Sequence, residues 1–122
     1  MKTYEERSIE YAKSLIAKGH KNPEVLRELL ICTTDKYSFP LVSDYFSHHL
    51  NDEVLLRRLF EVALEGDDSG DAPWAAANII SEFPAKLLSG YKEQLLELAD
   101  YDWIYLKAPA QAALKKISAS AT

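Results

Sequence analysis

An internal repeat constrains this chain more than any other feature of its sequence. The stretch from Leu59 to Ala77 recurs from Leu95 to Ala113, at a constant offset of 36 residues. Repetition at a period of about 20 to 50 residues is typical of stacked supersecondary units. Each copy has a leucine-rich run followed by a proline among alanines, which predicts a pair of helices. The identical pairs are Leu59/Leu95, Glu61/Glu97, Ala63/Ala99, Ala72/Ala108, Pro73/Pro109, Ala76/Ala112 and Ala77/Ala113.

Helix start and stop signals divide the rest of the chain. Thr3 followed by Glu6 is a capping-box pattern, which predicts a helix over about residues 4–18 that ends at Gly19. Short polar side chains cap helices, and proline is tolerated in a first helical turn because its missing N–H has no partner there. Such start signals recur at Asn22, Pro23, Pro40, Asn51, Asp52, Pro73 and Pro109.

No segment shows sustained two-residue alternation of apolar and polar side chains, so strands are not required and the sequence predicts an all-α fold. Pro84 is expected to end one helix, and a break near Ser89 and Gly90 should interrupt the next. Its inner face is predicted to carry Leu87, Leu88, Leu95, Leu96, Leu98 and Ala99. The expected organisation is one domain over 1–122, with a first helix in 1–20 and helical hairpins at 22–50, 51–83 and 84–118.

Paired helices, the second of which begins at Pro40, Pro73 or Pro109, resemble the HEAT or armadillo-like α-solenoids. The resemblance covers about residues 22–117. It implies a short right-handed solenoid of about three helical hairpins, with the first helix as a cap over one open end. In such a stack, every hairpin loop projects from the same edge, so residues far apart in the sequence become neighbours.

The distribution of charge limits the partners of this chain. The net charge is −5, and residues 51–105 carry twelve acidic side chains against four basic ones. A phosphate backbone would be repelled by this acidic middle, so direct nucleic-acid binding is not expected, whereas a basic partner would be attracted. No segment has the apolar length of a membrane span or the pattern of a cleaved leader. We therefore expect a cytoplasmic protein without membrane contact. The oligomeric state stays open, with a monomer favoured.

Motifs for catalysis or metal binding are weak. The loop 67–71 has oxygen ligands, but it lacks the alternating spacing and the glutamate of an EF-hand. His48 and His49 are adjacent, so their rings point about 100° apart on a helix and cannot easily bind one zinc ion. Cys32 lies in an apolar run and is expected to be a buried structural thiol. We expect no enzymatic activity and no cofactor.

Aromatic and acidic residues gather in the predicted hairpin loops 33–38, 65–71 and 100–105. Aromatic side chains beside carboxylates suit protein recognition, although Trp103 and Tyr105 could instead fold back over the helices beneath them. Trp74, one turn from a helix start, is expected to pack between repeats. The predicted partner-binding residues are Asp35, Tyr37, Asp67, Asp68, Asp71, Tyr101, Asp102, Trp103 and Tyr105.

In size, charge and helical-repeat style, the chain resembles bacterial toxin-immunity proteins, including those of contact-dependent inhibition systems. This resemblance implies an inhibitor that masks the basic cleft of a toxin, such as a nuclease domain, with its acidic and aromatic edge. The alternative is an adaptor that binds a peptide or helix in the concave groove of the stack, without inhibition. That alternative relies on Tyr45, Asn78, Glu82 and Gln111.

Overall fold

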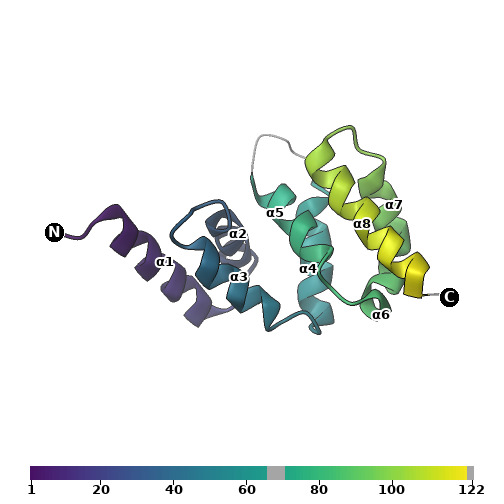
Figure 1. Cartoon of the computed structure of the whole chain (residues 1–122). Helices are drawn as coiled ribbons and strands as arrows, with labels where there is room; N and C mark the ends of the chain where they lie inside the picture. The colour runs from purple at the N-terminus through teal and green to yellow at the C-terminus, as the bar shows by residue number, and fades with distance from the viewer. Residues whose placement is uncertain (66–70, 121–122) are drawn as a thin grey trace. The chain divides into compact units, whose positions relative to one another are not determined.

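Helices form the secondary structure of this protein (Figure 1). The computed structural model describes residues 1–65 and 71–120, and within these residues it contains no β-strand. The prediction of an all-α fold is therefore confirmed. The chain divides into two compact units, Met1–His49 (unit 1) and Leu50–Thr122 (unit 2). The single-domain organisation over 1–122, with its hairpin boundaries, stays a prediction.

Unit 1 contains helices α1 (Tyr4–Lys18), α2 (Pro23–Cys32) and α3 (Phe39–Ser47). Each of them packs against the other two. The buried side chains come mainly from the apolar stripes that helical periodicity predicts, since residues three and four apart share one helix face. They are Ala12, Leu15, Leu26, Leu29, Leu30, Cys32, Val42 and Phe46.

The predicted caps of unit 1 are confirmed. Thr3 Oγ1 accepts a hydrogen bond of 3.1 Å from the backbone N–H of Glu6, and Asn22 Oδ1 accepts one of 2.8 Å from that of Glu24. α1 ends at Gly19, whose φ of 81° lies in the left-handed region that glycine adopts without strain. These local bonds explain why the sequence predicted the bounds of α1 correctly.

Unit 2 contains two helix pairs separated by a short helical segment. The elements are α4 (Glu53–Ala63), α5 (Asp71–Ile80), α6 (Ala85–Leu88), η1 (Ser89–Tyr91), α7 (Lys92–Ala99) and α8 (Ile104–Ser120). α5 packs against both α4 and α8, while α6 and α7 also pack against α8. Asp52 Oδ1 caps α4 by accepting hydrogen bonds from the N–H groups of Val54 and Leu55, at 3.0 and 3.2 Å. The 3₁₀ turn η1 confirms the predicted break near Ser89.

The two copies of the repeat differ in burial. Ala76 on α5 is fully buried, whereas its counterpart Ala112 on α8 is exposed. The reason is that α5 buries side chains around most of its circumference, whereas α8 buries the face that carries Leu106, Ala110 and Ala113. The alanines of α5 allow this, since a small side chain lets neighbouring helices approach closely.

Two expectations about the second copy are wrong. Pro109 does not begin the last helix, because the Trp103 carbonyl already accepts the N–H groups of Leu106 and Lys107, at 3.0 Å each. Pro109 lies inside α8, where it cannot donate to the carbonyl one turn earlier. Leu96 is 53% exposed rather than buried, since α7 packs by the face that carries Leu95 and Leu98.

In the described ranges 1–65 and 71–120, none of the helices combines the length and the apolar character needed to cross a bilayer.

Candidate functional site

At one end of unit 2, α4 and α7 end and α5 and α8 begin (Figure 1). Aromatic side chains from these segments contact one another there. Tyr101, in the connection between α7 and α8, donates a hydrogen bond of 3.2 Å from its hydroxyl to the carbonyl of Leu64. This contact attaches the connection to the residue that follows α4. Tyr101 is thereby half-buried and holds the neighbouring residues 102–105 at this end of the unit.

Three aromatic rings form a cluster there, which we call the aromatic trio: Trp74, Trp103 and Tyr105. The ring centroids of Trp74 and Tyr105 are 5.6 Å apart with an interplanar angle of 64°. Those of Trp103 and Tyr105 are also 5.6 Å apart, at 78°. Both pairs are edge-to-face, a favoured arrangement for aromatic rings. Tyr105 therefore joins a tryptophan of α5 to the tryptophan that precedes α8.

The aromatic trio is open to solvent on one side. Tyr105 is 53% exposed and the adjacent Ile104 is 57% exposed, while Trp74 and Trp103 are half-buried. Tyr105 was predicted to lie in a loop, but it is in the first turn of α8, since that helix begins at Ile104.

Trp74 is the residue of this site that the sequence prediction missed. Its position one turn into a helix suggested packing between repeats, and the structure does place it against a neighbouring helix. The contact is with the exposed Tyr105, however, so Trp74 extends the surface rather than the core. The sequence signal that could have identified Trp74 is its single large ring in an otherwise alanine-rich helix.

The carboxylates predicted for this surface divide into two groups. Asp71, in the first turn of α5, and Asp102, beside Trp103, are exposed. Because side chains three apart on a helix are neighbours, Asp71 lies next to Trp74. Asp67 and Asp68 lie outside the described residues, so their part in the site stays a prediction.

Asp35 and Tyr37 belong to unit 1, where Asp35 has an internal role. Asp35 Oδ1 accepts a hydrogen bond of 2.5 Å from the hydroxyl of Tyr4. Its Oδ2 accepts bonds from Ser8 Oγ and from the backbone and side chain of Ser38. The Tyr37 ring lies 5.7 Å from that of Tyr4 and carries Lys36 Nζ above it at 4.9 Å. Partner binding by Asp35 and Tyr37 stays a prediction.

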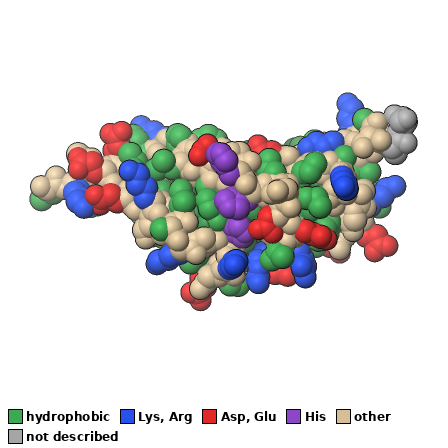
Figure 2. Space-filling view, turned by 90° about the horizontal axis from the view of Figure 1, so that it is seen from below, with side chains coloured by type: hydrophobic (Ala, Val, Ile, Leu, Met, Phe, Trp, Pro, Cys, Tyr) green, Lys and Arg blue, Asp and Glu red, His purple; other side chains and the backbone are tan. Residues whose placement is uncertain are grey.

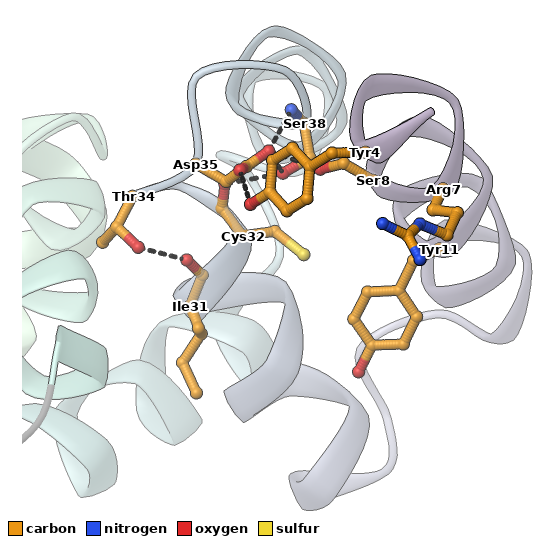
Figure 3. A pocket seen from close by; sticks show the side chains of 9 residues that line it. All are labelled: Tyr4, Arg7, Ser8, Tyr11, Ile31, Cys32, Thr34, Asp35 and Ser38. Carbon is orange, nitrogen blue, oxygen red and sulfur yellow. Dashed lines mark hydrogen bonds between the residues drawn. The ribbon is translucent and has the colours of Figure 1, made fainter. Parts of the chain in front are cut away.

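The Asp35 network lies in a cleft of about 560 Å³ that is lined by α1, the end of α2 and the connection between α2 and α3 (Figure 3). Hydrogen bonds from Ser8, Tyr4 and Ser38 hold the pKa of the Asp35 carboxyl well below its usual range. Cys32 also lines this cleft and is only 6% exposed. Burial raises the pKa of its thiol, which favours the unreactive protonated form.

This network predicts acid sensitivity. A carboxyl whose pKa is lower in the folded chain than its unfolded value of about 3.9 contributes stability above that value. The contribution is lost as the pH falls further toward the folded pKa. We expect Asp35→Asn to lower the free energy of unfolding most above about pH 5, and less below about pH 3. Urea unfolding followed by circular dichroism at several pH values measures this difference.

Tyr4→Phe is the matched variant, because it removes one donor to Asp35 and keeps the ring. It should weaken the pH dependence without abolishing it. If the free energy of unfolding falls equally with pH in the wild-type chain and in Asp35→Asn, Asp35 is not the source of the acid sensitivity.

The histidines form a second polar group, within unit 1. Figure 2 shows their side chains (purple) gathered on one face. His20 Nδ1 lies 2.5 Å from the hydroxyl of Tyr45, and the rings of His20 and His49 meet edge-to-face at 5.1 Å. His49 Nδ1 donates to the carbonyl of Tyr45 at 2.7 Å. Within residues 1–65 and 71–120, no group of three or more His, Cys, Asp or Glu side chains is placed to hold a metal ion.

The residues of the alternative groove prediction come from both units, and the groove stays a prediction. Tyr45 belongs to unit 1 and contacts His20 and His49. Asn78, Glu82 and Gln111 are exposed in unit 2, where the Asn78 amide donates to the Trp74 carbonyl at 3.1 Å.

Comparison with known proteins finds no matching family model, no similar curated protein and no similar solved structure.

Proposed function

We propose that this protein binds another protein through the aromatic trio and the carboxylates beside it. The observation that carries the proposal is the edge-to-face cluster of the half-buried Trp74 and Trp103 with the exposed Tyr105, next to the exposed Ile104. Tryptophan and tyrosine are enriched among the residues that dominate binding energy at protein interfaces. A protein gains little stability from leaving such rings in solvent, so a binding role accounts for their position better than a core role does.

The charge around the trio favours a basic partner. Asp71, Asp100 and Asp102 are exposed at this end of unit 2. Opposite charges on the partner would raise the association rate by steering, while the aromatic contacts would slow dissociation. Asp67 and Asp68 would add to this charge.

The specific form of the proposal is inhibition of a toxin. An acidic surface that competes with phosphate for a basic cleft would block a nuclease domain, as the resemblance to bacterial immunity proteins implies. In this proposal the chain acts in the cytoplasm, and its helix pairs belong to a short right-handed solenoid of about three hairpins with α1 as the cap. The packing of α4 with α5 and of α7 with α8 supports the solenoid within unit 2.

Co-expression tests this form of the proposal. The chain would be produced together with the C-terminal domain of the protein encoded immediately upstream, and the mixture separated by size-exclusion chromatography. A one-to-one complex, together with rescue of cells that the domain alone kills, would support inhibition. If neither a complex nor toxicity is observed, inhibition is overturned for that candidate and the adaptor is favoured.

Substitution tests the placement of the surface. We expect Trp103→Ala to weaken the complex about tenfold, since a central aromatic anchor contributes at least about 1.4 kcal/mol. The control is Leu96→Ala, which removes an exposed side chain of α7. Both affinities can be measured by calorimetry after circular dichroism has confirmed folding. Equal affinities for Trp103→Ala and the wild-type chain would show that the partner binds elsewhere.

Ionic strength separates this surface from an apolar groove. A steered acidic interface should lose association rate steeply as salt rises from about 0.01 to about 1 M, because the screening length falls from about 30 to about 3 Å. A groove that binds an apolar helix should keep its rate. Stopped-flow mixing, followed by tryptophan fluorescence, measures this rate directly.

A further inference from the structure

We infer that the aromatic trio binds a cationic side chain, an arginine or lysine of the protein partner, through the faces of its rings. The inference rests on the proposed function and names the chemistry that the partner must bring. Two features of unit 2 carry it: the arrangement of the three rings, and the sign of the charge around them.

The rings leave aromatic surface available. Tyr105 is 53% exposed and the two tryptophans are half-buried, so part of each residue is open to solvent. The two tryptophans meet Tyr105 at 64° and 78°, and they therefore line a corner instead of a flat stack. Aromatic cages recognise quaternary ammonium groups, and the face of a single tryptophan or tyrosine attracts the charged group of a lysine or arginine.

The charge at this end of the unit comes mainly from carboxylates. Helix starts carry partial positive charge and helix ends carry partial negative charge. Here α5 and α8 begin while α4 and α7 end, so these partial charges oppose each other. Asp71, Asp100 and Asp102 outnumber Lys107, the basic residue in the first turn of α8, so the local charge is negative. A carboxylate beside an aromatic face strengthens the attraction of a cation.

The described part of the chain does not place a cation of its own on the trio. Its cation–π contact lies in unit 1, where Lys36 Nζ is 4.9 Å from the centroid of the Tyr37 ring. A partner's guanidinium is the better occupant, because it is planar, stacks on aromatic faces and is less strongly hydrated than an ammonium. An arginine can also donate to a neighbouring carboxylate while it stacks.

The chain contains its own reporter for this site. It has two tryptophans, Trp74 and Trp103, and both belong to the trio. Intrinsic fluorescence of the full chain therefore reports on this surface directly. The probe is an acetylated, amidated hexa-arginine peptide, and its control is the same peptide with citrulline, which keeps the shape of arginine but is uncharged.

We expect the arginine peptide to change the tryptophan emission in a saturable manner, and to bind at least about fivefold more tightly than the citrulline peptide. Tyr105→Ala should abolish this preference, whereas Tyr105→Phe should keep it, because the phenyl face remains. Asp102→Asn should weaken binding of the arginine peptide, and Asp44→Asn, at an exposed carboxylate of unit 1, should not. Equal binding of the two peptides, or equal effects of Asp102→Asn and Asp44→Asn, would overturn the inference.

The partner complex distinguishes this inference from the proposed function. If Tyr105→Ala disrupts the complex but the two peptides bind alike, the cation inference is overturned and the proposed surface is supported. If the arginine preference is present but Tyr105→Ala leaves the complex intact, the cation site is supported and the proposed placement of the partner is overturned.

Discussion

Phe83→Ala is expected to lower the free energy of unfolding of unit 2 by about 3 to 5 kcal/mol. The Phe83 side chain is fully buried just after α5, so its removal loses apolar burial and leaves a cavity that helices can fill only in part. Natural domains have a total stability of about 5 to 15 kcal/mol, so the loss is a large fraction of what is available.

Urea unfolding followed by tryptophan fluorescence measures this change, because Trp74 and Trp103 both lie in unit 2. Leu96→Ala is the control, since Leu96 is 53% exposed and should lose no more than about 0.5 kcal/mol. Phe83→Leu keeps most of the volume and should cost less than Phe83→Ala, so a measurable variant remains if the alanine variant does not fold. Equal stabilities of Phe83→Ala and Leu96→Ala would contradict the buried position.

Lys116→Ala is expected to cost about 1.5 to 3 kcal/mol, the range for hydrogen bonds to a charged group. Lys116 Nζ donates to the carbonyls of Ser81 and Phe83, at 2.6 and 2.9 Å. These carbonyls follow the end of α5, where backbone acceptors lack partners within the helix. One side chain of α8 thus holds the C-terminal end of α5 in place.

The adjacent Lys115 is the matched control, because it is exposed and has the same charge and helix propensity. Lys115→Ala should change the stability by no more than about 0.5 kcal/mol. Lys116→Met keeps the aliphatic stem and isolates the loss of the two hydrogen bonds. The same thermal midpoint for Lys116→Ala and Lys115→Ala would show that these bonds do not stabilise unit 2.

The local signals predicted the helices well where the hydrogen bonds are local. Thr3, Asn22 and Asp52 each cap the helix that the sequence assigned to them. The error at Pro109 has a physical cause. A proline favours a first turn but does not require one, and the contacts of α8 with α5 and α7 offset the missing hydrogen bond.

The candidate site was predictable in part. Tyr101, Trp103 and Tyr105 are close in the sequence, and with Asp102 they lie at one end of unit 2, as their spacing suggested. The contact of Trp74 with Tyr105 joins residues 31 positions apart, and no local pattern encodes it. The role of Asp35 was not predicted for the same reason, because its donors Tyr4 and Ser8 lie on α1, far from Asp35 in the sequence.

By itself, the sequence determined the all-α fold, most helix starts and most of the apolar faces, because capping bonds and the helical period act within a few residues. Only the tertiary structure decided which copy of the repeat became buried. Ala76 and Ala112 occupy equivalent positions in the two copies, but the face of α5 that carries Ala76 is buried and the face of α8 that carries Ala112 is exposed. Burial and the meeting of distant rings depend on which helices become neighbours, and this choice is made by the whole core at once.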